Sequence, residues 1–366
     1  MLAFPITAAR GWRALTTVGL GLALACSDST GSSLTTAVRF LAVVGELGSD
    51  QRLIEYEAPP LSPRRVLPLV RNDTTLTVLL RSGARGGFYA LRFPGITLPA
   101  RGRWELVRFD ARWQVTATRS AVELGDSMSM EAVPYLQYTA DHQHLIANLH
   151  PLAGGNQLLV LDPGTLAPIT TVSRSTPPLP PGPPSGAVGS EVLLTWGSGG
   201  SPLIWVDVLT GATTDSVTIP NDYAFQGALT KRLIYRRGPQ SGAPRTELFD
   251  LQSGVPLAAL DSAVSLAPPM ITHDRLVYFQ LSGYAEVVDA SSFTELGRAL
   301  VDTGFGRHIA YAAVTDSATS MVIAASGDPS LCGSCLPPID AITVVDPQRI
   351  TTLLHTVVGQ PVVLVR

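Results

Sequence analysis

One short phrase recurs along this sequence and constrains the fold more than any other feature. It is an apolar run that closes on Asp, followed by a few turn-forming residues and a second apolar run, as in LIWVDVLTGATTDSVTI at residues 203–219. An Asp at the end of a strand can accept backbone N–H bonds from the residues just ahead and start an Asx-type turn. Each phrase therefore predicts a β-hairpin. The phrases place their acidic residue at Glu57, Asp110, Asp162, Asp207, Asp250, Asp289 and Asp346.

The spacing of the phrases predicts the fold class. The last five Asp residues are 45, 43, 39 and 57 residues apart, close to the roughly 40–50 residues of one propeller blade. Two further apolar runs precede each phrase, which gives four strands per unit. We therefore predict an all-β chain, a seven-bladed β-propeller of four-stranded antiparallel blades over residues 37–366. A β-sandwich or an array of small β domains is the alternative.

The two ends of the propeller region carry a further expectation. The segments TAVRFLAVVG at Thr36–Gly45 and QPVVLVR at the C-terminus both have the composition of strands. If the ring closes with strands from both ends of the chain, one of these segments belongs to a shared blade.

The N-terminus predicts export and a lipid anchor. Arg10 and Arg13 precede an apolar stretch, Ala14–Ala25, which is too short to span a bilayer and suits a cleaved signal. The run ALAC, which ends at Cys26, resembles the lipobox of bacterial lipoproteins. This resemblance implies a lipoprotein signal peptide over residues 1–25 and a lipid on Cys26, with ordinary secretion and a coincidental Cys as the alternative. The polar residues 26–36 then predict a flexible tether.

Ser27 bears on the location of the protein. A Ser at this position resembles lipoproteins that are sent to an outer membrane, where Asp would be usual for retention at an inner one. The resemblance implies a lipid-anchored protein of the cell envelope at the outer membrane. It leaves open whether the chain faces the periplasm or the cell surface.

Composition argues against a nucleic-acid partner. Charged residues make up 15% of the chain and the formal net charge is −3. No basic stripe is present that would suit a phosphate backbone. Cys332 and Cys335 form a C-x-x-C pair, which in an oxidising compartment predicts a local disulfide. A redox role is the alternative, but it needs a thioredoxin-like strand and helix context that the sequence lacks.

The sequence offers no catalytic, cofactor or metal-binding signature. It contains no G-x-S-x-G elbow, Walker loop, H-E-x-x-H or EF-hand loop. His142 and His144 alternate in a way that would place both imidazoles on one strand face, but Asp141 before them fits a turn with the two His residues on its shoulder. We therefore predict no catalytic residue, no cofactor and no metal site.

The Asp phrases resemble the repeats of bacterial seven-bladed propellers of the YVTN and quinoprotein-like type, over roughly residues 40–366. Asp207-x-x-Thr210-Gly211 matches the Asp-x-x-Thr-Gly core of quinoprotein repeats, and Asp250-x-x-Ser253-Gly254 differs only by Ser. That family continues to a Trp four residues after the Gly, where this chain has Asp215 and Ala258. The resemblance thus implies blade geometry without a pyrroloquinoline quinone site.

Three hypotheses for function follow from this predicted architecture and cellular location. The first is a non-enzymatic, lipid-anchored propeller that binds or scaffolds proteins of the cell envelope. The second is a propeller enzyme, a lactonase-like hydrolase or a degenerate quinoprotein, with an axial active site. The third is a subunit of an outer-membrane assembly machine. The partners implied are the membrane, through the lipid anchor, and other envelope proteins.

Overall fold

The chain divides into two compact units, Met1–Thr36 and Ala37–Arg366. The computed structural model describes parts of the second unit only, so the predicted signal peptide, Cys26 and the tether lie outside the described residues. The described residues are 37–45, 50–71, 74–82, 87–95, 103–125, 135–139, 141–149, 157–173, 186–195, 202–218, 223–228, 230, 233–238, 245–260, 270–272, 274–280, 283–301, 308–314, 322–327, 339–358 and 362–364.

The second unit is built from antiparallel β-sheets, and its described residues contain no α-helix. Seven separate sheets are present, which we number in chain order. Sheet 1 has the strand order β29-β1-β2-β3, sheet 2 runs from β4 to β8, and sheets 3 to 7 take four consecutive strands each. The prediction of an all-β chain is confirmed.

The strands are short, as expected for runs bounded by turn residues. In sheets 1 and 2 they are β29 (Val362–Leu364), β1 (Val38–Val44), β2 (Arg52–Ala58), β3 (Ser62–Pro68), β4 (Val70–Arg71), β5 (Thr74–Ser82), β6 (Gly87–Pro94), β7 (Glu105–Phe109) and β8 (Val115–Ser120). In sheets 3 and 4 they are β9 (Tyr135–Tyr138), β10 (Leu145–Leu149), β11 (Gln157–Leu161), β12 (Pro168–Ser173), β13 (Gly186–Val188), β14 (Glu191–Thr195), β15 (Pro202–Asp207) and β16 (Thr213–Thr218). In sheets 5 to 7 they are β17 (Ala224–Ala228), β18 (Leu233–Gly238), β19 (Arg245–Asp250), β20 (Val255–Leu260), β21 (Met270–Thr272), β22 (Arg275–Phe279), β23 (Tyr284–Asp289), β24 (Glu295–Leu300), β25 (His308–Val314), β26 (Val322–Gly327), β27 (Ile339–Asp346) and β28 (Thr351–Val357).

The central strands of each sheet are apolar on both faces, and the two faces pack against different neighbours. In β15, Leu203 and Trp205 join a cluster with residues of sheet 5, whereas Ile204 and Val206 join a cluster with residues of sheet 3. Successive side chains of a strand point to opposite faces, so one continuous apolar run serves two interfaces. This explains why the strands before the Asp residues carry consecutive apolar residues rather than alternating ones, even where Glu247 or Glu286 interrupts the run.

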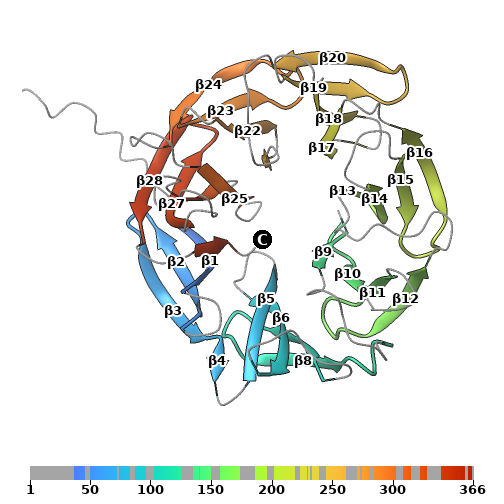
Figure 1. Ribbon diagram of the computed structural model, residues 1–366, viewed down its shortest axis with the longest axis vertical. Helices are drawn as coiled ribbons and strands as arrows, with labels where there is room; N and C mark the ends of the chain where they lie inside the picture. The colour runs from blue at the N-terminus through green and yellow to red at the C-terminus, as the bar shows by residue number, and fades with distance from the viewer. Residues whose placement is uncertain are drawn as a thin grey trace, which may run out of the picture. The chain divides into compact units, whose positions relative to one another are not determined.

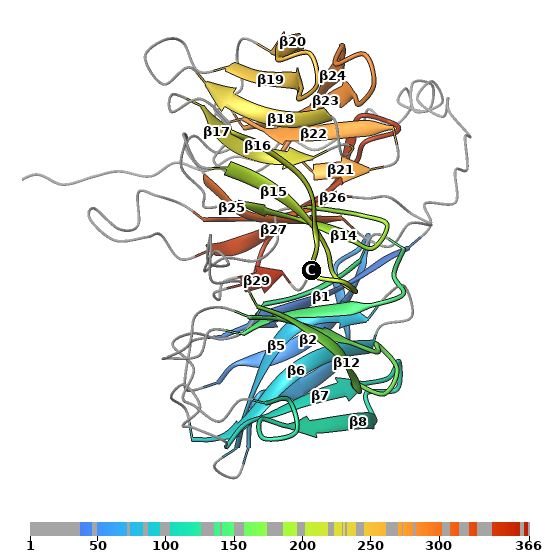
Figure 2. The ribbon, with the colours of Figure 1, turned by 90° about the vertical axis from the view of Figure 1, so that its right-hand side faces the viewer.

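Seven hydrophobic clusters lie between the sheets, and the strand residues of each cluster come from two sheets. Six clusters join sheets that follow one another in sequence, and the seventh joins sheet 7 back to sheet 1. Figures 1 and 2 agree that sheets adjacent in sequence are adjacent in space. Representative pairs across the junctions are Leu41 and Phe88, Tyr89 and Leu159, Val160 and Val192, Trp205 and Ile234, Leu248 and Tyr278, Val287 and Val345, and Ile342 and Phe40.

Sheet 1 combines strands from both ends of the unit. The C-terminal strand β29 pairs antiparallel with β1, with Val43 opposite Val363 and Val44 opposite Val362. The expectation that a segment from one end of the chain shares a sheet with the other end is thus confirmed. Three ladder pairs hold the last strand beside the first one, so the two ends cannot separate without breaking backbone hydrogen bonds.

Sheet 2 departs from the four strands predicted per sheet. It has a fifth strand, the two-residue β4, which pairs with β5 through Val70 opposite Thr75 and Arg71 opposite Thr74. The backbone N–H of Leu76 on β5 also donates to the carbonyl of the buried Leu69, just before β4, at 2.7 Å. The link between sheets 1 and 2 is therefore folded into the sheet instead of forming a free loop.

Candidate functional site

The antiparallel order of the strands gives the sheets two distinct edges. Each passage from the third strand of a sheet to the fourth, or from the fourth to the fifth in sheet 2, lies at one edge, which we call the Asp-turn edge. The passages from the second strand to the third (from the third to the fourth in sheet 2), and from one sheet to the next, lie at the opposite edge, which we call the loop edge. The turns that join the third strand to the fourth, or the fourth to the fifth in sheet 2, span three to six residues, and the other connections at the Asp-turn edge span two to seven, whereas one connection at the loop edge, between β8 and β9, spans fourteen.

The predicted Asp residues lie at the Asp-turn edge, each at the end of a third strand or, for Asp110, of the fourth strand of sheet 2. In sheet 4, Oδ1 of Asp207 accepts the backbone N–H groups of Leu209 and Thr210 at 3.0 and 2.8 Å and the Thr210 hydroxyl at 2.9 Å. Oδ1 of Asp162 accepts equivalent bonds from Gly164 and Thr165. Acceptance of N–H groups two and three residues ahead satisfies donors that the turn would otherwise leave unpaired. The carboxylates of Asp110, Asp250, Asp289 and Asp346 accept the same kind of backbone bond.

Glu57 holds the same place in sheet 1 but makes a different set of contacts. Its carboxylate pairs with Arg64 at 2.7 Å and with Arg39 at 3.7 Å. The residues two and three positions ahead are Pro59 and Pro60, which have no backbone N–H to donate. A longer acidic side chain that reaches two Arg residues therefore replaces the Asx-type turn in this sheet.

A residue with positive φ follows each Asp and completes the turn. In five turns it is the fourth residue after Asp. In the turns of sheets 3 to 6 its N–H donates to the Asp carbonyl at 2.8–2.9 Å. In the turn of sheet 2 it is Trp113, the third residue after Asp110. The six residues are Trp113, Leu166, Gly211, Gly254, Phe293 and Ile350, with φ between 54° and 72°.

The turns also carry an apolar side chain into the junction with the preceding sheet. Where the positive-φ residue is Gly211 or Gly254, the residue just after Asp packs there, Val208 or Leu251. Where it is bulky, the positive-φ residue itself packs into the junction, as Phe293 does at 3% exposure. Each Asp turn thus packs one apolar side chain against the preceding sheet.

The hydrogen bonds at the turns hold the carboxylates in their ionised form. The Ser291 hydroxyl, followed by the N–H and hydroxyl of Ser292, lowers the pKa of Asp289 far below its usual range. The N–H and hydroxyl of Thr165 lower the pKa of Asp162, and the N–H of Gln114 lowers that of Asp110. Carboxylates committed in this way are poor proton donors or acceptors near neutral pH.

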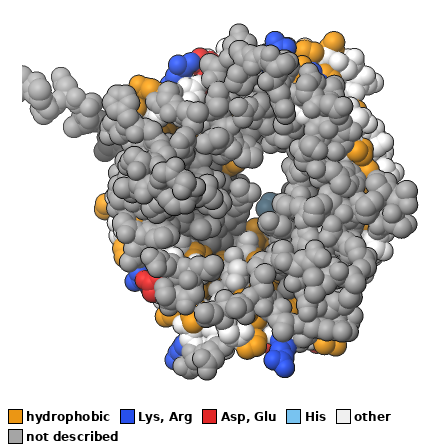
Figure 3. Space-filling view, viewed as in Figure 1, with side chains coloured by type: hydrophobic (Ala, Val, Ile, Leu, Met, Phe, Trp, Pro, Cys, Tyr) orange, Lys and Arg blue, Asp and Glu red, His pale blue; other side chains and the backbone are white. Residues whose placement is uncertain are grey.

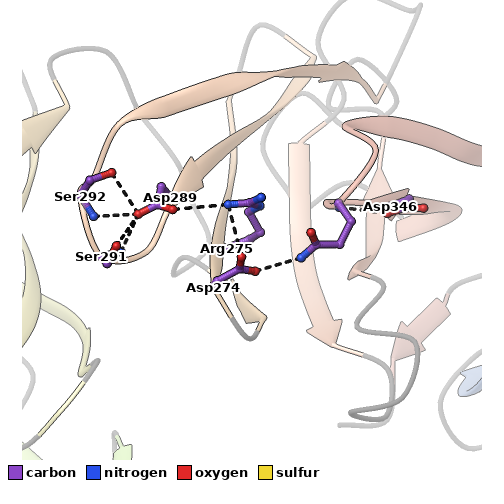
Figure 4. Close-up of polar contacts among 7 residues, drawn as sticks. Asp274, Arg275, Asp289, Ser291, Ser292 and Asp346 are labelled. Atoms are coloured by element: carbon purple, nitrogen blue, oxygen red, sulfur yellow. Dashed lines mark hydrogen bonds and ion pairs between the residues drawn. The ribbon is translucent and has the colours of Figure 1, made fainter.

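The turns of sheets 6 and 7 are joined by a polar bridge (Figure 4). Arg275 lies 3.4 Å from Asp289 and 3.5 Å from Asp274. Asp274 in turn accepts a bond of 2.9 Å from the Gln348 amide, two residues after Asp346 in the turn of sheet 7. The bridge uses the acidic groups of this edge for contacts between sheets. Among the described residues, no group of three or more His, Cys, Asp or Glu side chains has the arrangement of a metal site.

A second polar group, which sequence reasoning missed, lies in the junction between sheets 4 and 5. Arg236 on β18 is opposite Glu247 on β19, and both are buried, at 5% and 0% exposure. Glu247 Oε2 lies 3.0 Å from Arg236 Nε and 2.9 Å from Nη2. Its other oxygen lies 2.6 Å from Nη2 of Arg245. One fully buried carboxylate therefore bridges two guanidinium groups.

Aromatic rings enclose the buried guanidinium. The Arg236 Cζ atom lies 3.8 Å from the ring centre of Tyr223 and 3.5 Å from that of Phe249. Both rings belong to the hydrophobic cluster between sheets 4 and 5. Stacking between two rings supplies cation–π attraction in a site that excludes water. Oε2 of Glu247 adds a charge-assisted hydrogen bond from Nε of Arg236 and a close contact with its Nη2.

This group, which we call the Arg–Glu cluster (Tyr223, Arg236, Arg245, Glu247 and Phe249), reaches the loop edge. Arg245 opens β19 beside the connection from β18, and its side chain is 41% exposed. The charge of Glu247, and then a hydrogen bond that Arg245 donates to the Tyr223 hydroxyl oxygen, raise the pKa of Arg245. A sequence signal did exist, because Arg236 and Glu247 are charges of opposite sign at core-facing positions of adjacent strands.

The remaining predicted residues can be placed only in part. Cys26, Cys332 and Cys335 lie outside the described residues. His142 and His144 lie in the turn between β9 and β10, where Asp141 accepts the backbone N–H of Gln143 and the Thr139 hydroxyl. Within the described part of the chain, no helix has the length and apolar character needed to cross a membrane.

Comparison with known proteins places the fold but not a family. No protein-family model matches the chain, and no curated protein matches it in sequence. Among solved structures it is similar to one in the mitotic checkpoint complex, at a TM-score of 0.51 and 10% identity over 81% of this chain and 84% of that one. It is also similar to the C-terminal WD40 domain of Sif2, at a TM-score of 0.46 and 10% identity over 79% and 74% of the two chains. A third similar structure is BamB from Moraxella catarrhalis, at 0.43 and 11% over 88% and 91%. The neighbour at a TM-score of 0.51 is a β-propeller, so the all-β chain described above is propeller-like in fold.

Proposed function

We propose that the chain is a seven-bladed β-propeller, anchored by a lipid at the cell envelope, that binds or scaffolds other proteins through its loop edge. The observation that carries the fold is the cycle of seven hydrophobic clusters, each spanning two sheets and the last joining sheet 7 to sheet 1. A row of sheets would leave two apolar faces open to water, whereas a ring leaves none. The pairing of β29 with β1 supports closure at the same place.

The contrast between the two edges supports a binding role for the loop edge. The Asp-turn edge is made of short turns whose polar groups bond to one another and to the adjacent sheet. Longer connections gather at the loop edge, with fourteen residues between β8 and β9 and twelve between β12 and β13. Binding residues concentrate on such connections when a rigid scaffold positions them.

The anchor and its processing form the second half of the proposal. Residues 1–25 act as a lipoprotein signal peptide, Cys26 receives the lipid, and residues 26–36 tether the propeller to an outer membrane. Cys332 and Cys335 form a disulfide within the connection between β26 and β27. The support is the ALAC run and the C-x-x-C spacing in the sequence.

The anchor is tested by metabolic labelling in a bacterial host with an alkyne-tagged fatty acid. The wild-type protein should carry the label and sediment with membranes, and Cys26→Ala should abolish both. Cys332→Ser serves as the matched control and should keep the label. A labelled Cys26→Ala protein, or an unlabelled wild type, would refute the anchor.

The binding edge is tested by photo-crosslinking in intact envelopes. Benzoylphenylalanine is placed at Thr218, an exposed residue at the loop edge, or at Arg112, an exposed residue at the Asp-turn edge. We expect discrete protein adducts from Thr218 and none from Arg112. Adducts from Arg112 alone would place binding at the Asp-turn edge and refute the proposed loop-edge site. Adducts from neither position would contradict a protein-binding role.

A further inference from the structure

The Arg–Glu cluster contains two positively charged side chains and one negatively charged side chain. Two guanidinium groups, from Arg236 and Arg245, share the single carboxylate of Glu247. Glu247 is 0% exposed, and ionised side chains at such positions are costly unless they are fully paired. The carboxylate satisfies the buried Arg236 first, through two contacts, and leaves Arg245 with one.

Unsatisfied donors mark the same junction. The Nε atom of Arg245 is shielded from water and has no hydrogen-bond acceptor among the described residues, and the same is true of Nε1 of Trp205. Trp205 is 1% exposed and belongs to the same hydrophobic cluster as Tyr223 and Phe249. Buried N–H groups without acceptors are rare in folded proteins. One acceptor of the cluster, Oε1 of Glu247, also lacks a hydrogen bond, although it lies 2.6 Å from Nη2 of Arg245. Positive charge is still in excess, because two guanidinium groups face one carboxylate, and this excess favours an anionic partner.

The geometry points to a carboxylate-binding site at Arg245 on the loop edge of sheet 5, and we propose that this is where the protein takes hold of its ligand. The exposed 41% of the Arg245 side chain is the accessible face, and Glu247 fixes the guanidinium from behind. A guanidinium held in this way offers a planar fork that matches a carboxylate. Arg236 adds a second positive charge from a water-poor interior, where screening is weaker than on an open surface.

The aromatic rings explain why this Arg pair differs from ordinary surface pairs. Arg236 is locked between Tyr223 and Phe249, so the Glu247 carboxylate cannot turn away from Arg245 without leaving a buried guanidinium unpaired. The ordering of Arg245 is thus built into the junction and is not lost again when a ligand binds. By contrast, Arg298 pairs with Glu295 at 2.9 Å, but both side chains are more than 40% exposed.

The proposal deepens the proposed function, because it names the chemistry that the loop edge recognises. A carboxylate can come from a small organic acid or from the acidic side chains of a protein segment. Two probes separate these sources: succinate as the small acid, and a fluorescently labelled hexaglutamate peptide as the acidic segment. Both are titrated into the purified full chain, which carries Cys26→Ser so that it remains soluble without detergent.

The matched pair of variants is Arg245→Gln and Arg298→Gln. The two side chains have similar exposure, 41% and 44%, and each has a carboxylate partner, but only Arg245 belongs to the cluster. We expect Arg245→Gln to weaken binding of at least one probe tenfold or more and Arg298→Gln to leave it unchanged. Arg245→Lys should be intermediate, because it keeps the charge but loses the planar fork.

A direct readout comes from the arginine side-chain Nε–H signals in a nitrogen–proton NMR spectrum. The Arg245 signal is identified by its loss in Arg245→Gln, and we expect it to shift on addition of the probe that binds. Equal weakening by both variants would mean diffuse charge attraction and overturn the site. Failure of both probes to bind, or an Arg245 signal that does not move, would also overturn it.

Failure of this site is distinguishable from failure of the proposed function. If the loop-edge crosslinks from Thr218 persist in Arg245→Gln while neither probe binds, the chain is a binding module that does not use this carboxylate site. If the crosslinks are absent but succinate binds at Arg245, the site stands and the protein-binding role falls.

Discussion

The bulky residues at positive φ offer the sharpest test of how the turns hold the sheets together. Phe293 has a φ of 58°, a conformation that costs an L-residue about 1–2 kcal/mol. Its ring is 3% exposed and meets Tyr278 edge-on, with ring centres 6.3 Å apart. Truncation to Ala keeps the strained backbone and removes the ring, which should lower the free energy of unfolding by about 3–5 kcal/mol. Glycine also loses the ring but relieves about 1 kcal/mol of strain.

We therefore expect the stability order wild type, Phe293→Gly, Phe293→Ala, measured as the midpoint of urea unfolding followed by tryptophan fluorescence. Gly254→Ala is the reciprocal variant, because nothing lies within 4 Å of the added methyl group and only the backbone term of about 1 kcal/mol applies. Leu296→Ala, at an exposed position of β24, controls for loss of an apolar side chain and should change stability by less than about 0.5 kcal/mol. Phe293→Gly as stable as the wild type would refute the anchoring role, and identical Ala and Gly variants would refute the strain.

Three further outcomes are expected from the charged groups. Arg236→Met should lower the free energy of unfolding by about 3–5 kcal/mol, because it removes the buried partner of Glu247. The double variant Arg236→Met/Glu247→Leu should recover part of that loss, and a double variant less stable than the single one would contradict this. Burial, and then the charge of Glu295, raises the pKa of Glu286, so Glu286→Gln should stabilise the protein at pH 8 and lose that advantage as the pH falls through the raised pKa. The depressed pKa of Asp289 gives stability that is present above pH 4 and lost on acidification, so Asp289→Asn should flatten the stability–pH curve below pH 4, and an unchanged acid limb would count against the hydrogen bonds described.

Much of the architecture could be predicted because the strands and turns depend on residues close together in the sequence. In sheets 2 to 7 a turn that Asp begins joins two neighbouring strands, and the apolar run before it has the length of a strand. Gly211 and Gly254 could be read as turn residues, since Gly accepts positive φ without steric cost. Leu166, Phe293 and Ile350 could not be read in that way, because a bulky residue at positive φ is stable only when its neighbours hold it there.

The sequence by itself determined the strands, the hairpins and the number of phrases, because these depend on residues close together in the chain. Only the tertiary structure decided which faces meet, how β29 returns to β1, and that Arg236 and Glu247 share a buried junction with Tyr223 and Phe249. A charged residue in a strand reads as solvent-facing until its partner across the sheet is known. The burial of these two charges depends on a neighbouring sheet that is distant in sequence, and the residues around them in the chain do not specify it.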